Sequence, residues 1–190
     1  MEFFLFRHGE TNWNTAGLIK GQLDDSGIEF TENGQKQLRW IAEHVSGKGI
    51  SAIFSSDLCR TAETARYINQ ELHLPLHLTP NFRGLNLGIY QGMPTKEFRQ
   101  TEEFLAAFSD YDHVLPGGES VNQLRERFCG EMKHIRDTFP YDKVLIIAHR
   151  AAISNAYSHV THSPYKDLDY CILKTEGDAF LTVSAGRYES

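Results

Sequence analysis

The sequence has few cysteines, and nothing in their spacing suggests that they pair. Its 190 residues contain three of them, Cys59, Cys129 and Cys171, with no C-x-x-C pattern. An odd number of widely spaced cysteines argues against a disulfide framework and against a zinc site, so buried reduced thiols are the simpler interpretation. For Cys59, which lies beside Arg60, a reactive thiol is the alternative.

The chain also lacks an excess of positive charge and a long hydrophobic run. Its formal net charge is -6, which disfavours nucleic acid and anionic membranes as partners because both require a basic surface. The two conspicuous apolar runs, residues 3–6 and 144–148, are much shorter than a membrane span, and no signal peptide is evident. We therefore expect a soluble, cytoplasmic chain with a single domain over residues 1–190.

Familiar metal and nucleotide motifs are absent as well. The chain has 9 histidines but no H-E-x-x-H, and His159 with His162 makes only a weak pair. It has neither the G-x-x-x-x-G-K-[ST] phosphate loop nor the G-x-G-x-x-G fingerprint. The sequence therefore predicts no metal and no cofactor.

Buried strands alternate with amphipathic helices along the chain. Apolar runs predict strands at residues 3–6, 52–54, 76–78 and 144–148, with weaker strands at 171–173 and 180–183. Helical periodicity follows Thr31, Asp57, Pro94, Ser120 and Arg150. This order predicts an α/β fold, a three-layer α/β/α sandwich with a mainly parallel central sheet.

Two polar, glycine-containing stretches, residues 12–33 and 81–94, interrupt this pattern. Stretches of this length in compact domains usually bind a ligand, so we expect both to be functional loops. The helix after Ser120 carries charged residues that we interpret as a solvated face, Arg125, Glu126, Arg127 and Glu131.

Chemically versatile side chains follow the first predicted strand. Arg7, His8 and Gly9 come directly after residues 3–6. Imidazole can attack or relay protons near neutral pH, guanidinium can bind an oxyanion through two hydrogen bonds, and glycine lets a backbone approach a ligand closely. The alternative is a purely structural His8.

Two later strands lead to similar groups. Arg60 lies near the start of the helix that follows the second strand, and His149 follows the long strand at 144–148. Ligands of parallel sheets bind beyond the carboxyl ends of the strands, so these side chains should join Arg7 and His8 in a receptacle for a phosphate dianion. For Arg60 the alternative is a surface ion pair with Glu63, three residues further along the helix.

The chain contains RHGET at residues 7–11 with Asn14, Gly21, TENG at 31–34, SSDLCRTAETA at 55–65, PGGES at 116–120, and His149. In these segments it resembles the histidine phosphatase (phosphoglycerate mutase-like) superfamily, and the resemblance extends over most of its length. The segments at 7–11 and 55–65 are the specific ones. Residues 86–93 are similar to the corresponding segment of the phosphatases of the family, including the fructose-2,6-bisphosphatases.

This resemblance implies a phosphomonoester hydrolase that acts on a small phosphorylated metabolite without a metal. His8 would take the phosphoryl group as a phosphohistidine, which water then hydrolyses. The side chains of Arg7, Asn14, Arg60 and His149 would hold the phosphoryl oxygens and stabilise the charge that develops during transfer.

The chain departs from the family pattern at Gly84 and Arg150. A glutamate that protonates the leaving group normally stands where this chain has Gly84, and no Asp or Glu occurs in the surrounding loop. A small residue usually stands where this chain has Arg150. Another carboxylate such as Glu10, Asp57 or Glu119, or an acid within the substrate, would have to replace the missing group.

Two further functions follow from this departure and from the fold. Without an acid, the chain would be a phosphoryl-ligand-binding protein with little or no turnover. A phosphoglycerate mutase is the other alternative, although mutases of this type are longer than this chain.

Overall fold

A computed structural model describes residues 1–24 and 27–188, so residues 25 and 26 of the expected loop at 12–33 lie outside the described residues, as do 189 and 190. The strands are β1 (Glu2–Arg7), β2 (Ala52–Ser56), β3 (Leu76–Thr79), β4 (Lys143–Ala148), β5 (Tyr170–Glu176) and β6 (Ala179–Gly186). The α-helices are α1 (Asn12–Thr15), α2 (Glu32–Val45), α3 (Cys59–Leu72), α4 (Thr95–Phe98), α5 (Glu102–Ser109), α6 (Val121–Thr138) and α7 (Arg150–Thr161). Two short 3₁₀ helices, η1 (Pro80–Phe82) and η2 (Gly88–Tyr90), lie in the expected loop at 81–94. Within the described ranges no helix is both long and apolar enough to cross a membrane.

The six strands form one sheet in the order β3-β2-β4-β1-β5-β6. Strands β1 to β4 are parallel to their neighbours among these four, whereas β5 runs antiparallel to β1 and β6 antiparallel to β5. The prediction of a mainly parallel central sheet is confirmed. Because β1 pairs with β4 in parallel, both strands end at the same edge of the sheet.

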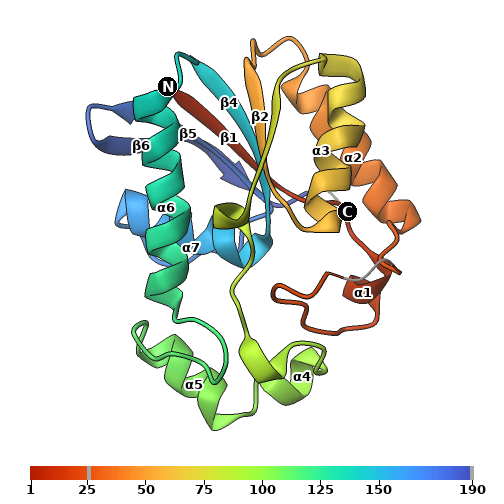
Figure 1. Cartoon of the computed structure of the whole chain (residues 1–190), viewed down its shortest axis with the longest axis vertical. Helices are drawn as coiled ribbons and strands as arrows, with labels where there is room; N and C mark the ends of the chain where they lie inside the picture. Colours follow the sequence, from red (N-terminus) through yellow and green to blue (C-terminus); the bar gives the residue numbers. More distant parts are fainter. Residues whose placement is uncertain (25–26, 189–190) are drawn as a thin grey trace.

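Helices cover both faces of this sheet, as Figure 1 shows: α2 and α3 lie on one face, α6 and α7 on the other. Successive side chains of β1 alternate between the two faces, so Phe3 and Leu5 pack towards α6 and α7, and Phe4 and Phe6 towards α2 and α3. This double burial explains why the first strand is apolar without alternation. The three-layer α/β/α sandwich is confirmed.

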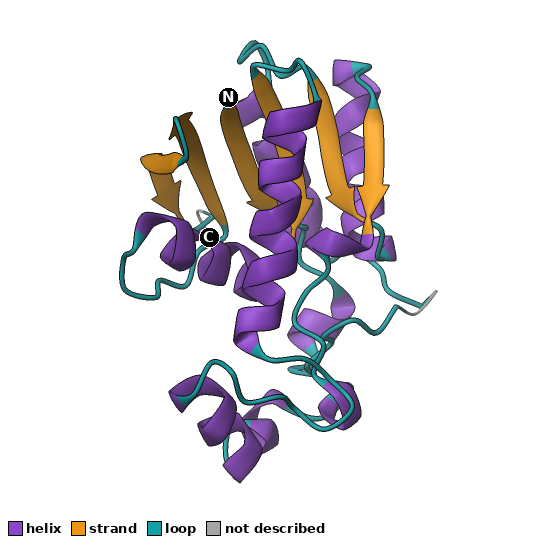
Figure 2. Ribbon diagram, turned by 60° about the vertical axis from the view of Figure 1, so that its left-hand side comes forward, coloured by secondary structure: helices purple, strands orange, loops and turns teal. Residues whose placement is uncertain are grey.

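The helix predicted after Pro94 is in fact two helices, α4 and α5. The side chain of Phe98 is buried at the end of α4, and the Thr101 hydroxyl accepts a hydrogen bond from the Phe104 N–H, which starts α5 afresh. Figure 2 shows the two helices beyond the carboxyl ends of the parallel strands. The expected loop at 12–33 likewise contains a short helix, α1. These segments lie where a ligand of the sheet would bind.

The central strands should carry most of the stability. Replacing the fully buried Leu145 of β4 by alanine leaves a cavity between the sheet and α3, and we expect a loss of about 2–5 kcal/mol in the free energy of unfolding. The matched change Leu105→Ala, at a side chain that is 60% exposed on α5, should alter it by less than about 0.5 kcal/mol. Urea denaturation of both variants makes this comparison, and equal losses would contradict it.

Candidate functional site

His8 and His149 face each other at the carboxyl edge of the sheet. The pairing of Arg7 with Ala148 places them side by side, each directly after its strand, and the His8 N–H donates to the Ala148 carbonyl at 3.1 Å. Their ring centroids are 5.4 Å apart in an edge-to-face arrangement, and both side chains are buried. The ends of β1 and β4 therefore lie side by side, as expected.

The imidazole of His8 is held in one tautomer. Its Nδ1 lies 2.7 Å from the Gly9 carbonyl oxygen, which can only accept, so Nδ1 carries the proton and Nε2 keeps its lone pair. Burial, and then the positive charges of Arg7 and Arg60, lower the pKa of His8 well below its ordinary value. His8 is therefore a neutral imidazole near pH 7, with its free nitrogen available for attack.

Gly9 serves a different purpose from the one that the sequence suggested. A Cβ at this position would stand 2.2 Å from Cδ1 of Leu38 and 2.9 Å from the carbonyl oxygen of Gly34, both in α2. The backbone thus approaches a helix here, and Gly9 is absent from the lining of the pocket. The absence of a side chain at Gly9 allows α2 to pack against the end of β1.

The guanidinium of Arg7 is oriented by Asp169, a residue that the sequence analysis missed. Arg7 Nη1 donates to Asp169 Oδ1 at 3.2 Å, and the same carboxylate accepts from Arg150 and from Arg187 at 2.7–2.9 Å. Burial raises the pKa of Asp169, but Arg150 and Arg7 outweigh this effect and hold the pKa below its ordinary value. Arg150 therefore belongs to this cluster as well as to the pocket wall.

Arg60 enters the pocket from the first turn of α3, and its predicted alternative is wrong. Glu63 pairs with Arg66 instead, while the Arg60 guanidinium donates to the carbonyl oxygens of Leu23 at 2.9 Å and Gly21 at 2.8 Å. Burial lowers the pKa of Arg60 to about 10, which leaves it charged at neutral pH. The Nε atom of Arg60 is buried and has no partner among the described residues.

The N-terminus of α3 is less open to an anion than expected. The N–H of Cys59 donates to both carboxylate oxygens of Asp24, at 2.8 and 3.0 Å, so a side chain already caps this helix end. Burial, with Asp24 and Glu63 nearby, raises the pKa of the Cys59 thiol, which argues against the reactive thiolate considered above. Arg60 itself, rather than the helix end, faces the pocket.

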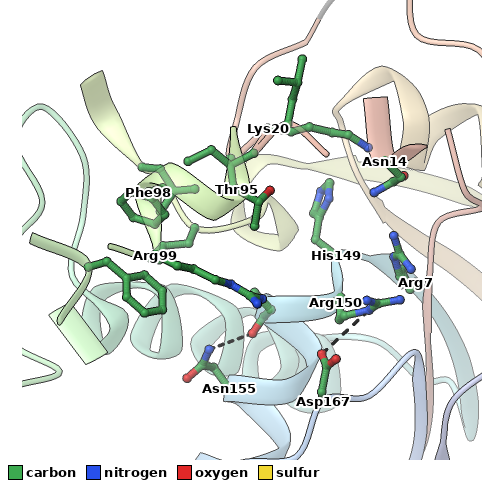
Figure 3. Close-up of a pocket in the computed structure, with 18 of the residues that line it drawn as sticks. Arg7, Asn14, Lys20, Thr95, Phe98, Arg99, His149, Arg150, Asn155 and Asp167 are labelled. Atoms are coloured by element: carbon green, nitrogen blue, oxygen red, sulfur yellow. Dashed lines mark hydrogen bonds and ion pairs between the residues drawn. The ribbon is translucent and has the colours of Figure 1, made fainter. Parts of the chain in front are cut away.

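Asn14 and Lys20 complete the ring of hydrogen-bond donors. The Asn14 Oδ1 accepts from the backbone N–H and the hydroxyl of Thr11, both at 3.0 Å, so its Nδ2 remains as the donor on the pocket side. Lys20, which the sequence analysis also missed, is buried, and its Nζ donates to Thr11 Oγ1 at 2.6 Å. In Figure 3, Arg7, Asn14, Lys20 and His149 surround a common space.

This space belongs to a cavity of about 670 Å³. Its inner end is cationic, whereas its outer wall is largely apolar and includes the side chains of Leu87, Phe98, Phe104, Phe108, Tyr111 and Tyr165. Such a cavity has the size and the mixed lining of a small-molecule site. Among residues 1–24 and 27–188, no cluster of three or more His, Cys, Asp or Glu side chains could hold a metal ion.

Gly84 lies in the wall beside His149. A Cβ on Gly84 would stand 3.4 Å from Cγ of His149 and 3.3 Å from the Gly21 carbonyl oxygen. A side chain here would therefore enter the pocket at the histidine, which is where a proton donor would be useful. In this chain, the residue at this position is glycine, so no side chain enters the pocket here.

Arg127 holds the backbone around Gly84, so the prediction of a purely solvated face on α6 is wrong for this residue. Its guanidinium donates to the carbonyl oxygens of Asn81, Arg83 and Gly84 at 2.7–2.9 Å and forms a bidentate pair with Glu119 at 2.6 and 3.0 Å. A single side chain thus ties three residues of this loop to α6.

The three carboxylates considered as substitutes for the missing acid are all engaged elsewhere. Glu119 pairs with Arg127, Asp57 forms a bidentate pair with Arg83 at 2.6 Å, and Glu10 accepts from the Thr31 hydroxyl at 2.7 Å. Each lies outside the lining of the cavity.

The chain is similar to known proteins in both sequence and fold. The sequence pattern of the histidine phosphatase superfamily (branch 1) matches residues 3–187. An uncharacterized phosphatase, PhoE, of Bacillus subtilis is 34% identical over 149 residues, which cover 78% of this chain and 72% of that protein. A probable phosphoglycerate mutase, GpmB, of Cronobacter sakazakii is 31% identical over 167 residues, which cover 86% of this chain and 76% of its own.

Solved structures share the fold at lower identity. YhfR of Bacillus stearothermophilus superposes with a TM-score of 0.84 at 22% identity, covering 99% of this chain and 98% of that one. The α-ribazole phosphatase of Shigella flexneri gives a TM-score of 0.81 at 20% identity, with both chains fully covered. At these identities the likeness supports the fold alone.

Removing the charge of Asp169 should destabilise the fold, because three guanidiniums then lose their shared partner. For Asp169→Asn we expect a loss of about 3–5 kcal/mol in the free energy of unfolding at pH 7. Since the folded-state pKa of Asp169 is depressed, its contribution is complete above the ordinary carboxyl pKa and is lost as the pH falls through the lower, folded-state value. The difference between wild type and variant should therefore shrink below roughly pH 4.

Asp167→Asn is the matched control for this experiment. The Asp167 carboxylate pairs with Arg187 at 2.6 Å but is 49% exposed, so the loss should stay below about 1 kcal/mol. Thermal unfolding of both variants between pH 3 and pH 7 tests the contrast; equal losses would contradict the central role of Asp169.

Proposed function

Because the chain belongs to branch 1 of the histidine phosphatase superfamily, we propose that it is a phosphomonoester hydrolase that acts on a small phosphorylated metabolite through a phosphohistidine. The observation that carries this proposal is the neutral His8 imidazole, with Nε2 unprotonated, at the cationic end of the cavity. A nucleophile that needs no separate base, facing several anion-binding donors, suits the transfer of a phosphoryl group.

In the first step, His8 Nε2 attacks phosphorus and the bond to the ester oxygen breaks. Arg7, Arg60 and the Nδ2 amide of Asn14 stabilise the negative charge on the three phosphoryl oxygens. In the second step, water attacks the phosphohistidine, inorganic phosphate leaves, and His8 returns to its starting state. Two displacements replace one difficult step, as in other covalent mechanisms.

His149 is suited to donate a hydrogen bond to the same group. Its Nε2 lies 3.1 Å from the Ser56 hydroxyl, whose oxygen already accepts from the Leu58 N–H. The Ser56 hydroxyl can therefore give its own proton to Nε2, and Nδ1 then carries the hydrogen of the neutral ring. This assignment supports His149 as a ligand of a phosphoryl oxygen.

Gly84 favours a second candidate, a phosphoryl-binding protein with little turnover. The place beside His149 holds no side chain, and the carboxylates Glu10, Asp57 and Glu119 are engaged. A phosphoglycerate mutase is a third candidate, to which the name of the Cronobacter sakazakii relative points. Release of free phosphate distinguishes a phosphatase from both, and a mutase would interconvert phosphoglycerate isomers with little phosphate release.

Loss of the nucleophile should abolish turnover. We expect His8→Ala to lower kcat/KM for 4-nitrophenyl phosphate by roughly 10⁴-fold or more, because the other neutral imidazole in the described lining, His149, has its Nε2 engaged by the Ser56 hydroxyl. Wild type quenched in base during turnover should carry one phosphoryl group, detected by intact mass and lost again on exposure to acid. His159→Ala, at an exposed histidine of α7, is the control and should behave as wild type. Equal rates for wild type and His8→Ala would disprove the nucleophile assignment.

Inorganic phosphate should stabilise the folded protein. At about 100 times its dissociation constant, a ligand that binds only the folded state adds about 2.7 kcal/mol to the free energy of unfolding, and dialysis should remove the gain. Arg60→Met should abolish most of this stabilisation, whereas Arg66→Met, at an exposed arginine of the same helix, should keep it. Thermal unfolding with and without phosphate measures the effect. Stabilisation without turnover on any ester would favour the binding protein.

A further inference from the structure

The proposed chemistry leaves one requirement open, which is a proton for the departing oxygen. Within the described residues, Asp167 is the only carboxylate that lines the cavity, and its charge is taken up by Arg187 at 2.6 Å and Arg150 at 3.9 Å. Each of its two carboxylate oxygens already faces a guanidinium, so neither is free to face the cavity. The proton must come from another group.

Among the described residues, no carboxylate forms an ion pair with Lys20. Its side chain is 7% exposed. Nζ makes one hydrogen bond, to Thr11 Oγ1 at 2.6 Å. An ammonium has three hydrogens, so two remain on a buried group in the cavity lining.

The position of Lys20 relates it to the empty place at Gly84. Gly21, the next residue after Lys20, presents the carbonyl oxygen that a Cβ on Gly84 would meet at 3.3 Å. The segment that carries Lys20 thus lies directly beside Gly84 and His149 in the lining of the pocket. Figure 3 shows Lys20 extending over His149 towards Asn14.

We propose that Lys20 donates the proton to the leaving oxygen, in place of a carboxylic acid at position 84; this inference rests on the proposed phosphatase function. As His8 Nε2 forms its bond to phosphorus and the phosphorus–oxygen bond breaks, one Nζ proton passes to the ester oxygen, which leaves as an alcohol. The neutral amine then takes a proton from the attacking water as the nitrogen–phosphorus bond breaks. Hydrogen phosphate, neutral His8 and the Lys20 ammonium result.

The surroundings of Lys20 suit a group that gains and loses a proton near neutral pH. Burial first, and then the charges of Arg60 and Arg7, lower the pKa of Lys20 to about 7, against a smaller opposing effect of Glu10. The other titratable groups that face it, His8 and His149, are neutral. A bound phosphate dianion would stabilise the ammonium form of Lys20. After the phosphate leaves, Lys20 could again lose its proton. General acids act best with a pKa near the working pH.

Tyr165 is the competing proton donor in the cavity lining. Its ring is 46% exposed, and burial, with Asp167 nearby, raises its pKa above the ordinary value. A phenol that holds its proton more tightly is a weaker acid at neutral pH. Lys20 is therefore the stronger acid of the two groups near neutral pH.

The test compares Lys20→Arg with wild type on 4-nitrophenyl phosphate, whose leaving group is a good one, and on phenyl phosphate, whose leaving group needs more help. Arginine keeps the positive charge and the hydrogen bonding but does not give up a proton near neutral pH. We expect kcat for phenyl phosphate to fall by roughly 10²–10⁴-fold and kcat for 4-nitrophenyl phosphate to fall far less. If Lys20 only binds phosphoryl oxygens, both esters lose the same factor or KM alone rises; either result overturns the proposal.

The pH profile provides a second readout that a structural role would not move. The alkaline decline of kcat/KM in wild type should reflect deprotonation of Lys20 and should be absent in Lys20→Arg. An alkaline limb that is unchanged in the variant contradicts the proposal. Tyr165→Phe, which removes the competing donor, should keep the wild-type ratio between the two esters. Lys36→Arg, at an exposed lysine of α2 outside the cavity lining, is the matched control and should keep the wild-type profile.

His8→Ala distinguishes failure of the Lys20 proposal from failure of the phosphatase function on which it rests. If wild type and His8→Ala are equally inactive on both esters, the phosphatase function fails and the role of Lys20 fails with it. If turnover depends on His8 but Lys20→Arg preserves the ratio between the esters, the phosphatase stands and only the proton donor is wrong.

Discussion

The structure depends on how it compensates the positive charge that it buries. Arg7 is 7% exposed, and its principal partner, Asp169, lies behind it, away from the ligand cavity. The Asp169 carboxylate also pairs with Arg150 and Arg187, and so joins the end of β1, the start of α7 and the chain after β6. The Asp169 carboxylate contacts Arg7 on the side away from the cavity. It therefore fixes the guanidinium and leaves positive charge facing the cavity. An anionic ligand can then supply the remaining compensation.

The same excess of positive charge lowers the pKa values of His8 and His149. Arg7 and Arg60 help burial to keep His8 neutral, and Arg60 with Arg127 does the same for His149. A site that binds a dianion strongly is therefore also a site in which an imidazole keeps the lone pair it needs for attack. In the function that we propose, anion binding and nucleophilicity have a common electrostatic cause, so neutralising an arginine would affect both.

The sequence predicts the parts of this arrangement that follow from local patterns. Two apolar runs in adjacent parallel strands bring His8 and His149 together, because parallel strands end at the same edge. Asp169 escaped prediction because its partner Arg7 is 162 positions away, and because its place depends on β5 running antiparallel to β1. Lys20 escaped because nothing in its neighbouring residues indicates that its ammonium is buried. In each case the missing information was tertiary, and no periodicity could supply it.

Gly84 shows how far the scaffold and the chemistry are separable. Arg127 holds this loop by the backbone, through the carbonyl oxygens of Asn81, Arg83 and Gly84, and Glu119 fixes Arg127 in turn. Such a tether places no demand on the side chain at position 84. The loop keeps its shape around a residue that contributes no acid, so the proton donor can change without a change in the pocket wall. If the neutral histidines and the fixed arginines hold the phosphoryl group, as we propose, the source of the proton can lie on whichever segment closes over it.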